Sequence, residues 1–246
     1  MNSLRCLVAP NPSPLTLEGT NTWIWGRAGS AYCVVVDPGP DDPSHLSNIV
    51  ACCRDLGSPV AAIVLTHDHS DHSEGAGELS RLTGAPVLSG RDGTLLEGPL
   101  TVLGSDAPEI GIVSLPGHSS DSVGVVFPEE RAIATGDIIF DRGSAMIDWP
   151  DGSLRDYLAS LDRLRDIIVQ RGLTRILPGH GGVITDPLEL VSQYHRHRLE
   201  RLDQVRALRD LPADQIVRKI YGDLTGELAE AATCSVRAQL DYLETR

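Results

Sequence analysis

The chain has 246 residues, 41% of them hydrophobic, which is enough to bury a large core in one big domain or in one domain with a small appendage. Its formal net charge of −13 disfavours a general nucleic-acid binder, because such proteins neutralise phosphates with a basic surface. No apolar run approaches the roughly 18 residues of a membrane helix, and prolines interrupt the N-terminal segment before a signal-peptide core could form.

Apolar, β-branched runs predict buried strands along the first 187 residues, and amphipathic runs with capping residues predict helices. In chain order we expect a strand in 31–39, a helix over 44–57, a strand in 60–66, a helix over 74–84, strands in 85–90, in 109–117 and twice in 122–137, a helix over 153–172 and a strand in 174–182. Ser44 is the expected N-cap of the first helix, and Ser153 and Gly172 are the expected caps of the last. This order predicts an α/β fold with two mixed sheets and helices outside them.

The sequence changes character after Pro187 and becomes charged and helical. Its pattern predicts a long helix over 188–210 and two short helices in 211–224 and 228–246, with a break at Gly222–Gly226. We therefore expect two parts, a catalytic domain over 1–187 and a linker helix with a small α-helical segment over 188–246.

Metal-seeking side chains follow several of the predicted strands, at the point where each strand ends. His67, His69, Asp71 and His72 lie on the loop after the strand that ends at Thr66. Three more candidates each follow another strand, namely His118, Asp137 and His180. Because ligands of open α/β sheets sit beyond the carboxyl ends of the strands, we expect these seven side chains to converge.

The residue types in this pattern indicate a metal site. Imidazole and carboxylate groups are good Zn²⁺ ligands, and seven of them suit two ions that share a hydroxide. A donor set without cysteine also leaves Mn²⁺ and Fe²⁺ open. His45, on a predicted helix without partners in sequence, is expected to be an ordinary surface or core residue.

The motifs "THDHSDH", "GHSSDS", "TGD" and "PGHGG", in that order, resemble the metallo-β-lactamase superfamily over roughly residues 5–187. The resemblance implies an αβ/βα sandwich with the metals at one edge. It assigns His67, His69 and His118 to the first metal. It assigns Asp71, His72 and His180 to the second metal, with Asp137 bridging the two.

Three further stretches resemble one branch of that superfamily, the β-lactamase-like hydrolases that include a single-strand endoribonuclease. These are "NPSPLTLEGTNTW" (11–23), "HRLER" (197–201) and residues 215–243, which are similar to a C-terminal winged-helix segment. Ala238-Gln239-Leu240 stands where that segment usually has Ala-His-Leu, and the chain ends at Arg246, where wing strands are expected to begin. The appendage is therefore expected to be a partial winged helix.

The predicted reaction is hydrolysis by a metal-bridging hydroxide, which Asp71 would orient as well as bind metal. Asp37 is either a hydrogen-bond partner of a ligand histidine or a simple turn residue before Pro38. Asn21 is either a substrate contact or a turn residue. His197 and Arg201 share a helix face that, with Arg198, either binds an anionic group of the substrate or is a solvated charged surface.

Several substrates and partners stay open. The branch resemblance implies a phosphodiesterase acting on single-stranded RNA, although aromatic residues are only 4% of the chain and stacking platforms are scarce. A hydrolase of esters or thioesters, of the acyl-CoA or glutathione type, is the second reading, and β-lactam hydrolysis is the third. A binding module acting through the C-terminal segment is the non-enzymatic alternative. We expect a cytoplasmic protein without a membrane partner, and a homodimer is one open arrangement.

Overall fold

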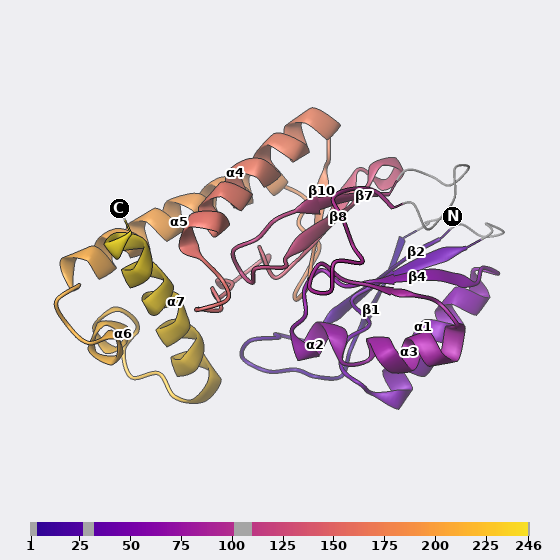
Figure 1. Cartoon of the computed structure of the whole chain (residues 1–246), viewed down its shortest axis with the longest axis horizontal. Helices are drawn as coiled ribbons and strands as arrows, with labels where there is room; N and C mark the ends of the chain where they lie inside the picture. The colour runs from indigo at the N-terminus through magenta and orange to yellow at the C-terminus, as the bar shows by residue number, and fades with distance from the viewer. Residues whose placement is uncertain (1–3, 27–31, 101–109, 246) are drawn as a thin grey trace.

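Two five-stranded sheets face each other in the computed structural model, which describes residues 4–26, 32–100 and 110–245 (Figure 1). The first sheet has the order β1 (Leu4–Val8), β2 (Asn21–Gly26), β3 (Cys33–Val36), β4 (Val60–Val64), β5 (Val87–Leu88). The second has the order β10 (Arg175–Pro178), β9 (Ala132–Gly136), β8 (Val123–Phe127), β7 (Gly111–Ser114), β6 (Gly98–Pro99). Ala31 and Glu109, which begin two of the predicted strands, lie outside the described residues.

Both sheets are mixed, as the sequence predicts. β3, β4 and β5 run parallel, and β1, β2 and β3 pair antiparallel. In the second sheet β9 and β10 are parallel, and the other pairs are antiparallel. Neighbouring parallel strands end at the same edge of a sheet, so β3 with β4 and β9 with β10 bring the residues that follow them together.

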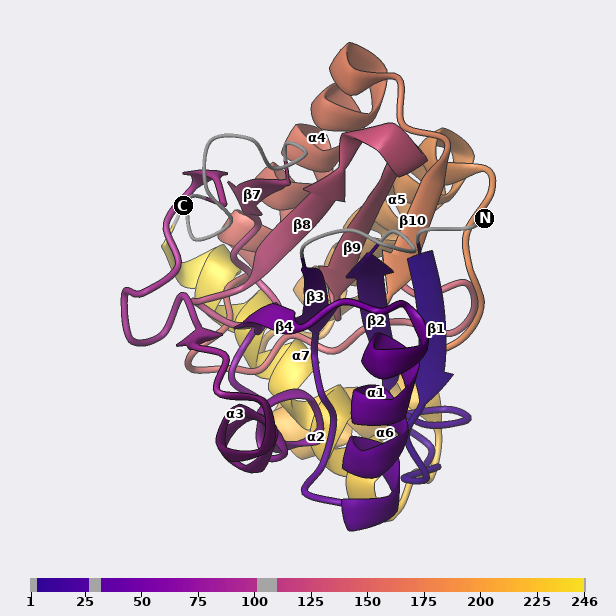
Figure 2. The same cartoon turned by 90° about the vertical axis from the view of Figure 1, so that its right-hand side faces the viewer.

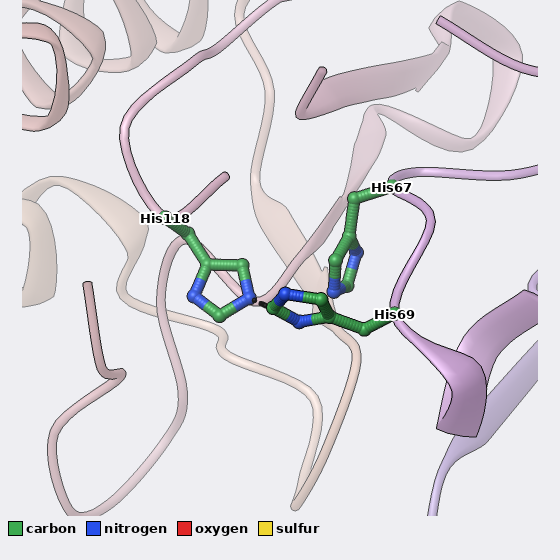
Figure 3. Close-up of side chains that lie close together, drawn as sticks. All are labelled: His67, His69 and His118. Carbon is green, nitrogen blue, oxygen red and sulfur yellow. Dashed lines mark hydrogen bonds between the residues drawn. The ribbon is translucent and has the colours of Figure 1, made fainter. Parts of the chain in front are cut away.

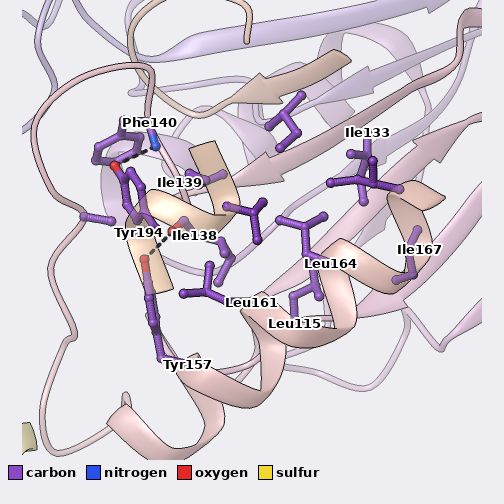
Figure 4. Close-up of a cluster of buried hydrophobic side chains, with 14 of the residues drawn as sticks. Leu115, Ile133, Ile138, Ile139, Phe140, Tyr157, Leu161, Leu164, Ile167 and Tyr194 are labelled. Atoms are coloured by element: carbon purple, nitrogen blue, oxygen red, sulfur yellow. Dashed lines mark hydrogen bonds between the residues drawn. The ribbon is translucent and has the colours of Figure 1, made fainter. Parts of the chain in front are cut away.

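Helices cover the outer faces of the two sheets, so the fold is the αβ/βα sandwich expected from the sequence (Figure 2). α1 (Pro43–Asp55) and α3 (Ala76–Thr83) pack on the first sheet. α4 (Leu154–Arg171) and α5 (Pro187–Ala207) pack near the second, where Leu161 and Leu164 meet Ile133 (Figure 4). Between the sheets lies an apolar layer in which the rings of Trp25 and Phe127 stack with centroids 6.4 Å apart.

The helix ends differ from the sequence prediction in two places. Asp42, not Ser44, caps α1, because its side chain accepts a hydrogen bond from the His45 backbone at 2.7 Å and Pro43 fits the first turn. His72 lies in a short helix, α2 (Ser70–Ser73), rather than on a loop, with Asp71 favourably placed in its first turn. Ser153 and Gly172 cap α4 as predicted. Between β8 and β9 the chain forms the 3₁₀ helix η2 (Pro128–Glu130).

The C-terminal part consists of α5, α6 (Ala213–Tyr221) and α7 (Gly226–Glu244), and the described residues contain no strand after β10. Tyr194 of α5 and Tyr242 of α7 belong to the same apolar core as α4. A second small core forms around Val205 and Ile216, between α5, α6 and α7. The C-terminal helices are thus packed against the sandwich, and the division near residue 187 stays a prediction. Among the described residues, no helix is both long and apolar enough to cross a membrane.

Candidate metal centre

The seven side chains predicted from the strand ends converge at one edge of the sandwich. Their donor atoms form three overlapping groups, each within 4.8 Å, namely His67 with His69 and His118, His67 with His72 and Asp137, and Asp71 with His72 and His180. The first group and the last are the two ligand sets that the family resemblance implies. Asp137 lies between them, with its Oδ2 3.9 Å from His118 Nε2 and 3.3 Å from His180 Nε2.

Tight turns after the strands bring these side chains together. Gly136, with a φ of 51°, lets the chain pass beside the Thr66 side chain before Asp137. Gly179 precedes His180, and a Cβ added there would lie 2.3 Å from Asp137 Oδ1 and 2.7 Å from His72 Cε1. Glycine at position 179 therefore leaves the room that the donor groups occupy.

In the first ligand set, ring nitrogens of His69 and His118 face each other (Figure 3). His118 Nδ1 donates to the Met146 carbonyl at 2.8 Å, and burial lowers the pKa of His118, so its Nε2 carries a lone pair. His69 Nε2 donates to the Asp148 carboxylate at 3.0 Å, which leaves a lone pair on Nδ1 in the neutral ring. These two nitrogens are 3.0 Å apart, so either a shared proton or a metal ion bound by both makes the contact favourable.

The second ligand set repeats the arrangement. His72 Nδ1 donates to Asp37 at 2.9 Å, and His180 Nδ1 donates to the Gly19 carbonyl at 3.2 Å. Their Nε2 atoms face each other at 3.3 Å. Asp71 Oδ2 lies 3.2 Å from His180 Nε2 and 3.4 Å from His72 Nε2, which adds negative charge at the same point.

These distances fit metal ions. Two nitrogens bound to one tetrahedral Zn²⁺ at about 2.0–2.1 Å lie roughly 3.3 Å apart. Two buried ligand atoms at the centre, His67 Nε2 and Asp137 Oδ1, make no regular hydrogen bond, although His72 Nε2 lies 3.2 Å from the Asp137 oxygen. Buried polar atoms usually have partners, so both atoms suit a role as metal ligands. The His and Asp groups thus support the binding of divalent metal.

The electrostatics of the centre also favour cations. Burial alone would lower the pKa of His72, but Asp137, Asp71 and Asp37 around it raise that pKa well above its ordinary value. Burial lowers the pKa of His180, but the nearby Asp137 carboxylate outweighs this effect and raises that pKa to about 9. Burial would raise the pKa of Asp137, yet His180 and His72 hold it well below its usual range. The carboxylates stay ionised and attract positive charge to this point.

Asp37 lies behind the second ligand set, 1% exposed. Its Oδ2 accepts from His72 Nδ1, and its two oxygens accept from the Thr66 amide and hydroxyl, both at 2.7 Å. The carboxylate is therefore fully engaged and fixes the orientation of the His72 ring. Of the two interpretations open from the sequence, the contacts match the hydrogen-bond partner of a ligand histidine.

A cavity of about 790 Å³ opens over the centre, between the sandwich and the C-terminal helices. His69, Asp71, His118, Asp137 and His180 form its floor. Its walls combine polar and apolar side chains from the segment before β2, the loop after β9, α5, and α6, α7 and their connection. The apolar ones include Leu15, Leu17, Phe140, Met146, Tyr221, Leu224, Leu228 and Ala231. The cavity can thus hold an apolar group beside a polar reaction centre.

The four predicted substrate residues are placed differently from one another. His197 and Arg201 line the cavity, with Arg201 Nη2 3.5 Å from His197 Nε2 and its guanidinium 4.5 Å over the Tyr221 ring. Arg198 also borders the cavity, but it is only 5% exposed and donates to the Ala145 carbonyl. Asn21 does not reach the cavity, because its buried amide donates to the carbonyls of Pro178 and Gly181. Asn21 thus supports the turn that carries His180.

The partners of His69 and His118 were not predicted from the sequence. These are Asp148, which accepts from His69, and the Met146 carbonyl, which accepts from His118. Both lie on the loop between β9 and α4, about 30 to 80 residues from the histidines they contact, and a backbone carbonyl carries no residue-type signal. A sequence feature that could have suggested Asp148 is its position on the loop that follows β9.

Comparisons with known proteins agree with this fold and centre. A model described as "Beta-lactamase superfamily domain" matches residues 32–128, and a model described as "Metallo-beta-lactamase superfamily" matches residues 99–180. The matched span, 32–180, contains all seven converging side chains.

Relatives match over most of the chain. The "Beta-lactamase-like protein 2 homolog" of Drosophila melanogaster is 29% identical and covers 99% of this chain and 88% of its own length. The "Atrochrysone carboxyl ACP thioesterase" of a Cryptosporiopsis species is 27% identical, over 92% of this chain and 74% of its own. A beta-lactamase domain protein from Burkholderia ambifaria shares the fold with a TM-score of 0.81, at 22% identity, over 99% of this chain and 86% of that one. The chain therefore belongs to the metallo-β-lactamase superfamily of metal-dependent hydrolases.

Proposed function

We propose that the chain is a two-metal hydrolase, with Zn²⁺ as the favoured ion, that cleaves thioesters or esters with an apolar acyl group. His67, His69 and His118 would hold one ion, Asp71, His72 and His180 the other, and Asp137 would contact both. When bound, such ions activate water and polarise the substrate carbonyl. Nitrogen and oxygen donors also suit Mn²⁺ and Fe²⁺, so the native metal has to be measured.

The apolar part of the cavity wall is the observation that best supports a substrate with an apolar acyl group. Leu15, Leu17, Leu224 and Leu228 lie on the wall of the space whose floor is the metal centre. Burying an acyl chain there gains roughly 0.8 kcal/mol per CH₂ group. The resemblance to a protein named as an acyl-carrier-protein thioesterase supports the same substrate class.

Asp71 is the side chain placed to orient the attacking water in this reaction. It lies on the cavity floor between His72 and His180, and its side chain is 28% exposed. In the proposed reaction water adds to the thioester carbonyl, the carbon–sulfur bond breaks, and an acid and a thiol leave. Burial would raise the pKa of Asp71, but His72 and His180 hold it well below its usual range, so the carboxylate stays ionised. Asp71 would therefore accept a hydrogen bond from the attacking water and orient it, while the proton of that water passes to the departing sulfur.

Single-stranded RNA is the second candidate, because His197 and Arg201 lie near the centre. The Arg201 guanidinium could bind phosphate there, whereas burial and the neighbouring Arg198 and Arg201 lower the pKa of His197. Arg142 also lines the cavity, but it is paired with Glu18 and Asp141. Among the described residues that line the cavity, only Phe140 and Tyr221 are phenylalanine, tyrosine or tryptophan, so stacking of successive bases finds little support.

A side-by-side turnover assay of the metal-loaded protein tests the proposal. The substrates are an acyl-CoA thioester, single-stranded RNA and a β-lactam. We expect the thioester to be hydrolysed, Asp71→Ala to lose about a hundredfold or more of that rate, and Asp68→Ala to keep it. Asp68 is a matched control because it is exposed and lies outside the donor groups. Cleavage of RNA with the thioester left intact would reverse the order of the two candidates.

A further inference from the structure

One short loop, residues 145–148, holds the outer nitrogens of two ligand histidines. The Met146 carbonyl accepts from His118 Nδ1 at 2.8 Å, and Asp148 accepts from His69 Nε2 at 3.0 Å. The Asp148 amide also donates to the His118 carbonyl at 2.9 Å. The loop thus sets both the tautomer and the ring orientation of these histidines.

The C-terminal helices anchor the same loop at its two other residues. Arg198 of α5 donates to the Ala145 carbonyl, and Ser235 of α7 accepts from the Ile147 amide at 3.3 Å. Both side chains are nearly buried, with exposures of 5% and 6%. The guanidinium of Arg198 also lies 4.5 Å over the Tyr157 ring, which fixes its position. Anchored and ligand-holding residues therefore alternate along the loop.

We infer that Arg198 and Ser235 are positioning residues for the first metal, so that the C-terminal helices organise half of the metal centre. The inference rests on the proposed two-metal centre but not on the substrate. It gives Arg198 a role other than direct contact with substrate, which matches its engagement with a backbone carbonyl. It also predicts a difference between the two halves of the centre.

The second ligand set is held independently of this loop. His72 is oriented by Asp37, and His180 by the Gly19 carbonyl. These partners lie before α1, far in sequence from α5 and α7. Loosening the loop should therefore weaken one metal and spare the other.

Titration of the metal-free protein with Zn²⁺ against a chelator of known affinity measures the two binding steps separately. We expect Arg198→Met and Ser235→Ala each to weaken one step by about 10- to 100-fold, and to change the other by less than about twofold. Arg198→Lys, which keeps a donor, should restore part of the loss. Arg201→Met is the matched control on the same helix and cavity wall, because Arg201 contacts Gln204 and His197 rather than the loop. It should leave both steps unchanged.

A double-mutant cycle identifies the affected half. In a His69→Ala background, Arg198→Met should cause little further loss, since its effect passes through the first ligand set. The inference is overturned if both Zn²⁺ affinities of Arg198→Met and of Ser235→Ala equal those of the wild type. It is also overturned if these variants lose the same affinity in both binding steps. Ser235→Ala is the smaller change and decides the question if Arg198→Met does not fold. If the wild-type protein has no thioesterase activity, only the substrate proposal fails, because the titration and the double-mutant cycle measure Zn²⁺ affinity and not turnover.

Discussion

The carboxylate of Asp37 accepts a hydrogen bond from His72 Nδ1 at 2.9 Å, and both side chains are at most 1% exposed. Asp37 also has a positive φ of 52°, a conformation that asparagine tolerates nearly as well as aspartate. Asp37→Asn therefore removes the charge without demanding a new backbone. We expect it to weaken the binding of one metal by about 10- to 100-fold, measured by chelator competition.

The matching control for that variant is Asp41→Asn, an exposed aspartate a few residues along the same segment. It should leave metal affinity at the wild-type value. An Asp37→Asn protein that binds both ions as tightly as the wild type would show that the orientation of His72 does not depend on this bond.

Gly179 is expected to be indispensable to the centre. A methyl group there would lie 2.3 Å from Asp137 Oδ1, so Gly179→Ala must displace a carboxylate placed between the two ligand sets. We predict a loss of metal affinity of about tenfold or more, read as metal content after dialysis. Gly77→Ala is the control, because Gly77 lies in α3 with nothing within 4 Å of its added Cβ. It should keep the metal and gain slight stability, since alanine favours helices.

His45 predicts a pH dependence of stability that is independent of the metal centre. It is buried, with Nε2 2.8 Å from Thr22 Oγ1, and this burial lowers the pKa of His45 although Asp42 partly opposes it. The unfolded chain takes up the proton first as pH falls below the ordinary value of 6.5, so the free energy of unfolding decreases in that range. Above that pH His45 is neutral in both the folded and the unfolded chain, so it no longer changes the free energy of unfolding with pH.

His45→Gln should remove this part of the pH dependence. Urea unfolding between about pH 8 and pH 5 measures it. The histidine at position 195, partly exposed on α5, provides the control His195→Gln. Equal pH slopes for wild type and His45→Gln would contradict the account of a buried neutral histidine.

The apolar wall predicts control over acyl length. Ala231 of α7 faces the cavity, and Ala231→Phe would fill part of its volume. We expect the ratio of kcat/KM for long over short acyl thioesters to fall by about tenfold, because burial of a few CH₂ groups is lost. Ala207→Phe, at the exposed end of α5 and outside the cavity, should leave the ratio unchanged.

The convergence of the seven donor side chains could be predicted from the sequence because each part of its signal is local. His67, His118 and Asp137 each follow an apolar strand, and strand ends meet at one edge of a sheet whatever the details of packing. β2 was not predicted as a strand because Asn21 and Thr22 begin it and Gly26 ends it, which leaves an apolar run of only three residues. β1, at the edge of the same sheet, is short and was also missed.

The roles of the other residues depend on contacts that spacing does not encode. Arg198 was predicted beside His197 and Arg201 as a substrate contact, yet its main partner is a carbonyl 53 residues earlier. For Asn21 the sequence left a substrate contact and a turn residue open, and the structure has its amide donating to the Gly181 carbonyl. Long-range bonds to backbone atoms of this kind arise from tertiary packing and leave no pattern of residue types in the sequence.

The central claim is that these donors hold two divalent cations side by side. Anomalous diffraction from crystals of the zinc-loaded protein tests it most directly, because it locates each ion without reference to activity. The account predicts two peaks, one against His67, His69 and His118, the other against Asp71, His72 and His180, with Asp137 reaching both. A single peak at full zinc occupancy, or an ion outside these groups, would contradict it.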